Sequence, residues 1–199
     1  RRGRPTVHKA FSEPLALLAG DGLIVMAYRV LLQAGLTDPQ RLTLLMDNLT
    51  EGVGLPGGIV AGQAWECETA ADLSQYQRSK TGALFVAATR AGALSSGSDP
   101  TPWGPLGDFL GEAYQVADDI RDVMGADQLG KPTGQDAQHG RPSATAALGL
   151  TGAIEYFEGL IQRAVSSIPA GPGQSTMQNL VAQESERLVP RQIIVRKAP

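Results

Sequence analysis

Three polar residues, Gln115, Asp118 and Asp122, follow one another at spacings of three and four. These spacings place them on one face of an α-helix, with Asp119 beside them. A solvated acidic face is the ordinary explanation. Carboxylates one turn apart repel each other, however, and near a helix C-terminus they meet the negative end of the dipole. A hard cation such as Mg²⁺ would relieve both costs, because it takes one or two carboxylate ligands together with water and substrate phosphates.

Basic residues occur where a phosphate group could use them. They are Arg1, Arg2, Lys80, Lys131 and Arg141. Taken singly, each is an ordinary surface charge. Lys80 is distinctive because Thr81 and Gly82 follow it inside an apolar helical segment, where a kink could release a backbone carbonyl. A glycine needed only for packing is the alternative.

The elements that must position these residues are helices, because apolar residues recur at three- and four-residue spacings and strand alternation is nearly absent. We expect helices over 12–35, 38–51, 59–67, 72–94 with an interruption at Gly82, 106–124, 143–150, 153–167 and 173–189. Gly62 would allow two of them to approach closely. Residues 125–142 lack the periodicity and are predicted to form a surface loop of the kind that often carries function.

The composition limits the classes of function. With 199 residues and 42% hydrophobic content, the chain can bury the core of one domain. Its net charge of −3 provides no basic field for nucleic acid. The single cysteine, Cys67, cannot form an intramolecular disulfide, and a cytoplasmic setting fits best. The apolar range 15–36 contains Asp21 and Arg29, each costing about 2.5–3.5 kcal/mol in a bilayer centre, so we expect a buried helix and no membrane span.

Six short motifs occur in an order that resembles one known family. They are RRGRPTVH at 1–8, AGD at 19–21, GQ at 62–63, KTG at 80–82, YQVADDIRD at 114–122 and GKPTGQD at 130–136. Together they resemble the polyprenyl diphosphate synthases, and most of all the geranylgeranyl diphosphate synthases of bacterial carotenoid and photosynthetic pigment pathways. The resemblance covers nearly the whole chain.

The resemblance implies an all-α, isoprenoid synthase-type helical bundle around a central cavity, with residues 1–199 as a single domain that acts as a homodimer. It also implies a magnesium site at Asp118, Asp119 and Asp122, in which Asp118 is the expected direct ligand. Near the reacting carbon it places Thr81, Gln115 and the carbonyl of Lys80. The substrate-binding residues that it implies are Arg1, Lys80 and Lys131 for the allylic diphosphate, Arg2 for isopentenyl diphosphate, and Arg141 for a further phosphate contact.

The implied reaction is the condensation of an allylic diphosphate with isopentenyl diphosphate. Metal ions and cations stabilise the charge that grows on the departing diphosphate, and a carbocation results. Neutral dipoles can stabilise that cation without capturing it. No strong side-chain base is needed, and we assign no proton transfer to His8 or His139, the two histidines of the chain.

The sequence departs from the family at its start. The family's first aspartate-rich motif lies just upstream of the paired arginines and is absent here, so we expect that an N-terminal portion is missing. A noncatalytic regulatory subunit and a farnesyl diphosphate synthase are the alternatives. A terpene cyclase is disfavoured by the arginine motif, and a plain helical interaction module leaves the ordered motifs unexplained. Glu66 stands where the family commonly has aspartate, and the product length is not encoded in this chain.

Overall fold

The computed structural model describes residues 3–34, 38–65, 78–124 and 143–189, and all regular structure in these ranges is helical. This confirms the all-α prediction. The elements are α1 (Val7–Ala10), α2 (Glu13–Ala34), α3 (Pro39–Val53), α4 (Ile59–Ala64), the π-helical turn η3 (Arg78–Gly82), α6 (Ala83–Ser96), the 3-10 turn η4 (Thr101–Trp103), α7 (Gly104–Met124), α9 (Ala144–Ser167) and α10 (Gln174–Leu188).

Local capping signals set several helix ends where the sequence predicts them. The Asp38 carboxylate accepts a hydrogen bond from the Arg41 backbone N–H at 3.0 Å, and a proline follows in the first turn of α3. Ser143 caps α9 in the same way by accepting from the Ala146 N–H at 3.2 Å. At the other end of a helix, Gly97 terminates α6 with φ +76°, a conformation that glycine adopts without strain.

The predicted break between helices at 143–150 and 153–167 is present inside α9. Gly149 has φ +70° and ψ 171°, so α9 consists of two helical segments that meet at a kink, which lies slightly before the predicted boundary. The break leaves a short first segment that presents its N-terminus to the end of α7. This position matters for the site described below.

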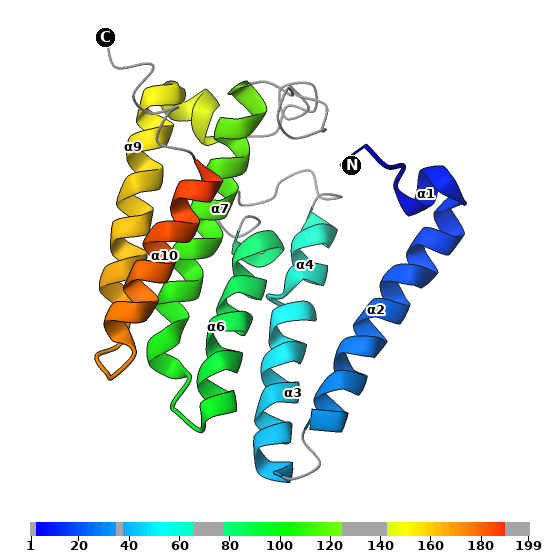
Figure 1. The fold of residues 1–199 in the computed structure, drawn as a ribbon. Coiled ribbons are helices and arrows are strands. Elements are labelled where there is room, and N and C mark those ends of the chain that lie inside the picture. Colours follow the sequence, from blue (N-terminus) through cyan, green and yellow to red (C-terminus); the bar gives the residue numbers. More distant parts are fainter. Residues whose placement is uncertain (1–2, 35–37, 66–77, 125–142, 190–199) are drawn as a thin grey trace.

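The core lies along α7, whose apolar side packs against α9 and α6. Ala113, Ala117 and Ile120 of α7 are fully buried, and they pack with Phe157 and Leu160 of α9. Figure 1 shows α3, α6, α7 and α9 side by side, with α10 crossing in front of α7 and α9. The helix that carries the three aspartates of the predicted magnesium site is therefore the central helix of the bundle.

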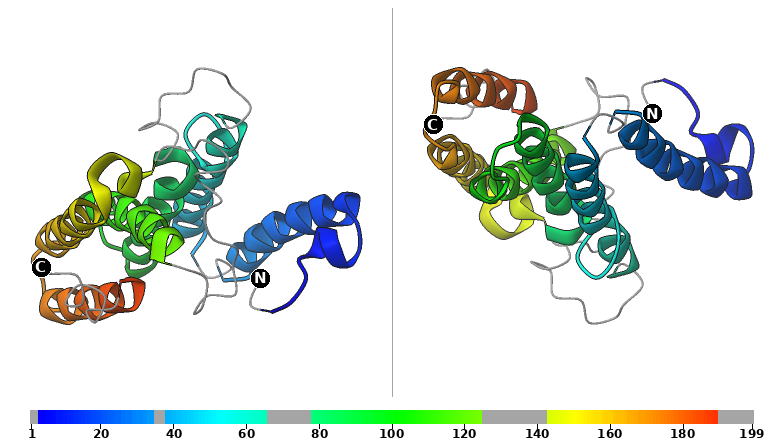
Figure 2. Two further views of the ribbon diagram at one scale, coloured as in Figure 1. Left: turned by 90° about the horizontal axis from the view of Figure 1, so that it is seen from above. Right: turned by 90° about the horizontal axis from the view of Figure 1, so that it is seen from below.

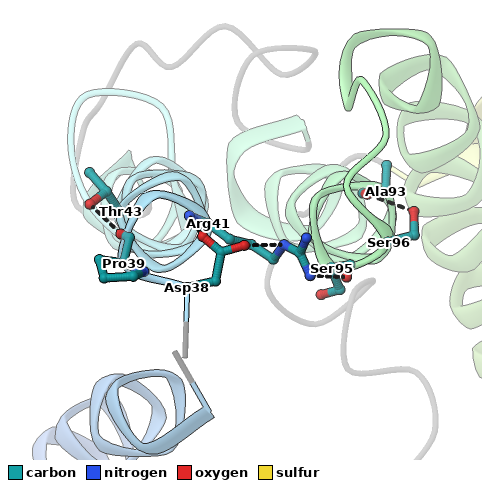
Figure 3. Close-up of polar contacts among 7 residues, drawn as sticks. All are labelled: Asp38, Pro39, Arg41, Thr43, Ala93, Ser95 and Ser96. Atoms are coloured by element: carbon teal, nitrogen blue, oxygen red, sulfur yellow. Dashed lines mark hydrogen bonds and ion pairs between the residues drawn. The ribbon is translucent and has the colours of Figure 1, made fainter. Parts of the chain in front are cut away.

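Polar contacts join α3 to α6. Arg41 donates from Nη1 to the Ser95 carbonyl at 3.2 Å, and its Nε lies 3.3 Å from Asp38 Oδ2 (Figure 3). Deeper in the interface, the buried Asn48 side chain donates from Nδ2 to the Ala87 carbonyl at 2.8 Å. These contacts fix the position of α6 relative to α3. Because η3, which contains the lysine motif, directly precedes α6, they also help to position that motif.

The prediction that 15–36 forms a buried helix is wrong for this chain. α2 contains no buried residue, and both views in Figure 2 show it standing away from the bundle. Leu17 and Leu23 are 72% and 66% exposed. A hydrogen bond of 3.1 Å between Tyr28 Oη and Thr50 Oγ1 joins α2 to α3. The helix is apolar as its sequence indicates, but its contacts with α1 and α3 leave all of its residues at least partly exposed.

By length and composition α2 could cross a membrane, and it is the one helix of the described residues with that property. Core helices of globular proteins pass the same test. The expectation that the chain has no membrane span therefore stays a prediction.

Candidate active site

The lysine motif lies in a wide helical turn. Lys80 and Thr81 belong to η3, a π-helical turn that leads directly into α6. Such turns are rare inside helices and occur often at functional sites, because they shift the hydrogen-bonding register and change where side chains point. The sequence predicts an interruption at Gly82, and the structure has one there.

Glycines on both sides allow η3 to sit close to its neighbours. A Cβ on Gly62 of α4 would overlap the backbone of Ser79 and Lys80, and a Cβ on Gly111 of α7 would lie 2.7 Å from the Cα of Gly82. The predicted close approach at Gly62 is therefore confirmed. Its consequence is that the backbone of η3 is held against α4 at Lys80 and against α7 at Gly82.

A chain of hydrogen bonds joins η3 to α7 and α9. The Thr81 hydroxyl donates to Gln115 Oε1 at 3.4 Å, and Gln115 Nε2 donates to Asp119 Oδ1 at 3.1 Å. The other carboxylate oxygen, Asp119 Oδ2, accepts from the Ala144 backbone N–H at 2.7 Å. Thr81 and Gln115, which the family resemblance assigns to one reaction centre, are thus brought together from positions 34 residues apart.

Asp118 and Asp122 lie one turn apart on α7, and both are partly exposed. Arg121 Nη2 is 3.4 Å from Asp118 Oδ1, and its Nε donates to the Ala117 carbonyl at 3.1 Å. Arg121 therefore supplies part of the positive charge that the acidic face requires. No role was predicted for Arg121, although its position three residues after Asp118 on a helix indicates an ion pair.

The described residues contain no cluster of three or more His, Cys, Asp or Glu side chains that could hold a metal ion by themselves. Two carboxylates on one helix face nevertheless fit Mg²⁺, which takes one or two carboxylates and completes its shell with water and phosphate oxygens. Asp118 and Asp122 meet that requirement. Asp119 differs, because it is only 3% exposed and both of its oxygens accept hydrogen bonds from the protein.

Four of the predicted substrate-binding residues lie outside the described part of the chain. They are Arg1, Arg2, Lys131 and Arg141. Glu66 and His139 also fall outside it, and so does the predicted loop over 125–142. These assignments stay predictions.

An apolar pocket of about 770 Å³ lies between α6, α7 and α10. Its wall includes Phe85 and Tyr114, whose ring centroids are 5.5 Å apart. Tyr114 directly precedes Gln115, and Phe85 follows Thr81 by four residues. Two residues of the pocket wall are therefore close in sequence to the hydrogen-bonded chain. Among the predicted site residues that the structure describes, none lines the pocket.

Comparisons with protein families and with known relatives identify the same family. A family model described as Polyprenyl synthetase matches residues 1–167. A geranylgeranyl diphosphate synthase of Cereibacter sphaeroides is 48% identical over 197 residues, which is 98% of this chain and 68% of the relative. A geranylgeranyl diphosphate synthase of Rhodobacter capsulatus is 43% identical over 95% of this chain and 66% of its own length. The chain thus spans about two thirds of these relatives.

Solved structures give the same fold. An FPP/GFPP synthase from Zymomonas mobilis superposes with a TM-score of 0.77 at 27% identity, over 95% of this chain and 66% of that one. A geranyltransferase from Helicobacter pylori, complexed with magnesium and isoprenyl diphosphate, has a TM-score of 0.80 at 27% identity, over 94% and 65%. The helical bundle is therefore that of solved isoprenoid synthases.

Proposed function

Because this chain belongs to the polyprenyl synthetase family, we propose that the full-length protein is a prenyltransferase that condenses an allylic diphosphate with isopentenyl diphosphate. The relatives named geranylgeranyl diphosphate synthase, at 48% and 43% identity, support geranylgeranyl diphosphate as the product. The observation that carries the proposal is the contact between Thr81 and Gln115. It joins the lysine turn to the acidic helix in one site.

Mg²⁺ is the proposed cofactor, with Asp118 and Asp122 as its protein ligands. When bound, it stabilises the negative charge that develops on the departing diphosphate. Both carboxylates lie on one face of α7, so they would approach the ion from the same side. Arg121 holds Asp118 from a neighbouring position on that helix.

Cationic side chains bind the diphosphates in this proposal. Lys80 belongs to η3, where its backbone is fixed by Gly62, and it would hold the allylic diphosphate through a charge-assisted hydrogen bond. Lys131 and Arg1 would assist it, Arg2 would hold isopentenyl diphosphate, and Arg141 would contribute a further phosphate contact. The last four roles rest on the sequence motifs.

Thr81 and Gln115 provide neutral dipoles toward the reacting carbon. Their hydrogen bond holds both side chains in place before reaction, so that little reorganisation is needed when positive charge develops. Neither side chain is basic enough to remove a proton. Their contribution is therefore electrostatic stabilisation of the cation.

We also propose a cytoplasmic homodimer that supplies carotenoid biosynthesis. The exposed apolar surface of α2 supports the dimer, because large apolar patches mark interaction sites. Leu17→Lys on α2 should then lower the dimer fraction in sedimentation experiments. Leu148→Lys, at an exposed leucine of α9, is the matched control. A Leu17→Lys protein with unchanged association would remove α2 from the interface.

Product analysis tests the proposed function. The full-length protein is incubated with Mg²⁺, isopentenyl diphosphate and each of the dimethylallyl, geranyl and farnesyl diphosphates, and the products are separated by chain length. We expect geranylgeranyl diphosphate from all three. A farnesyl end product would instead identify a farnesyl diphosphate synthase, and the absence of any elongated product would favour a noncatalytic regulatory subunit.

A further inference from the structure

Asp119 is the one carboxylate among the buried polar side chains of the described residues, with 3% of its surface exposed. Burying a carboxylate is costly unless hydrogen bonds satisfy it. Here the Gln115 side chain and the Ala144 backbone N–H each donate to one of its oxygens, at 3.1 and 2.7 Å. Its environment thus differs from that of the neighbouring Asp118, whose side chain is 37% exposed.

The carboxylate of Asp119 determines which way the Gln115 amide faces. An ionised carboxylate can only accept hydrogen bonds, so the Gln115 group that meets it must be the NH₂. Oε1 of Gln115 then faces Thr81, and because a carbonyl oxygen can only accept, the Thr81 hydroxyl has to donate. The hydroxyl hydrogen is thereby directed at Gln115. Thr81 can therefore present only its oxygen lone pairs to any other group.

The contact with Ala144 holds Asp119 in this orientation. The Ala144 N–H belongs to the first turn of α9, where backbone donors have no partner within the helix, and an anion is favoured there by the helix dipole. Ser143 satisfies the Ala146 N–H of the same turn. The carboxylate is therefore fixed from α9 on one side and directs Gln115 on the other.

We propose that Asp119 is a positioning residue that sets the polarity of the Thr81–Gln115 pair, so that the Thr81 oxygen lone pairs face the cation formed in the reaction. The inference rests on the proposed prenyltransferase function and deepens it. It gives Asp119 a role separate from the metal-binding role proposed for Asp118 and Asp122. Electrostatic stabilisation by a fixed dipole depends on its sign, so reversing the pair would turn stabilisation into opposition.

Asp119→Asn tests this with almost no change in volume. An asparagine side chain has one acceptor oxygen, and the Ala144 N–H requires it, so the NH₂ of the substituted side chain would face Gln115. The Gln115 amide would then turn over, and Thr81 would have to accept. We expect kcat to fall by about tenfold to a hundredfold, somewhat less than the loss of a whole oriented donor, while the Mg²⁺ concentration for half-maximal activity stays within about twofold. A metal-ligand role predicts instead a large rise in that concentration and rescue by excess Mg²⁺, and this result would overturn the inference.

A double-mutant cycle separates positioning from a general structural effect. If Asp119 acts through Gln115, Asp119→Asn should have little further effect on kcat in a Gln115→Ala background. If Asp119→Asn lowers kcat in the Gln115→Ala background as much as it does in the active parent, the positioning role is wrong and the proposed function still stands. A full-length parent protein that condenses nothing overturns the proposed function, and the inference falls with it.

A measurement without turnover completes the test. Hydrogen exchange of the Ala144 amide should be slow in the parent and in Asp119→Asn, because both offer an acceptor, and fast in Asp119→Ala. Thermal unfolding of the same proteins shows whether each variant is folded. Equal exchange rates in the parent and in Asp119→Ala would show that the Ala144 N–H does not bind the Asp119 carboxylate, and would overturn the inference that this contact orients Asp119.

Discussion

Replacing Gly62 by alanine should disturb the lysine turn from outside the site. Gly62 is a buried residue of α4, and a Cβ there would overlap the backbone of Ser79 and Lys80. Backbone atoms cannot rotate away as a side chain can. The overlap is therefore relieved only if α4 and η3 move apart, which shifts the position from which the Lys80 side chain reaches the proposed diphosphate.

Two opposing terms decide the size of the effect. Alanine is favoured over glycine in a helix interior by about 1 kcal/mol, whereas forcing an extra carbon into a packed interface costs typically about 1–3 kcal/mol. The added carbon would lie well inside van der Waals contact with the Lys80 backbone N and Cα, so the upper part of that range, about 2–3 kcal/mol, applies. We therefore expect a net loss of stability of roughly 1–2 kcal/mol, or about 2–8 °C in Tm for a domain of this size. A displacement approaching about 1 Å in a reacting group can cost about a hundredfold in rate, so kcat/KM for the allylic substrate should fall by at least about tenfold.

Thermal unfolding and steady-state kinetics of the full-length protein measure both quantities. Gly159→Ala in α9 is the matched control, because a Cβ at that position meets nothing within 4 Å. It should raise the stability by up to about 1 kcal/mol and leave the kinetics unchanged. A Gly62→Ala protein as stable and as active as the parent would refute the reasoning that Gly62 holds η3 in place.

Three further substitutions have defined outcomes. Asp118→Ala should lower turnover by at least about a hundredfold, roughly 2.7 kcal/mol of activation free energy. The control Glu158→Ala, at an exposed position of α9, should leave turnover unchanged. An Asp118→Ala protein with activity within about threefold of the parent would remove Asp118 from the metal site. Lys80→Ala should weaken binding of the allylic diphosphate more than binding of isopentenyl diphosphate in titrations. Equal losses of affinity for the two substrates would indicate a structural role. Asn48→Ala removes the buried hydrogen bond to the Ala87 carbonyl and should cost about 1–3 kcal/mol in urea unfolding, with kcat unchanged.

Helix positions were predictable from the sequence because their signals are local. Asp38, Ser143 and Gly97 end or begin helices through contacts with residues only a few positions away. Gly82 likewise marked the interruption that the structure shows as a π-helical turn. The apolar spacing over 106–124 also predicted the helix α7, since periodicity reports which face is buried; its central position in the bundle came from the structure.

Two features were not predictable, for a physical reason that they share. Hydropathy shows that α2 is apolar, but burial depends on how much of the helix its neighbours cover, and its contacts with α1 and α3 bury none of its residues. The spacing of Asp118 and Asp119 likewise shows two adjacent carboxylates without showing their partners. The Ala144 N–H that donates to Asp119 lies 25 residues later in the sequence, at the start of another helix.

The central claim is that Mg²⁺ and an allylic diphosphate bind between the acidic face of α7 and the lysine turn η3. It is tested most directly by a crystal structure of the full-length protein with Mg²⁺ and a non-ionising thio-analogue of the allylic diphosphate. We expect a metal ion coordinated by Asp118, a diphosphate oxygen within hydrogen-bonding distance of Lys80 Nζ, and Asp119 still hydrogen-bonded to Gln115 and Ala144. A diphosphate bound elsewhere, with Asp118 and Lys80 contacting neither metal nor phosphate, would contradict it.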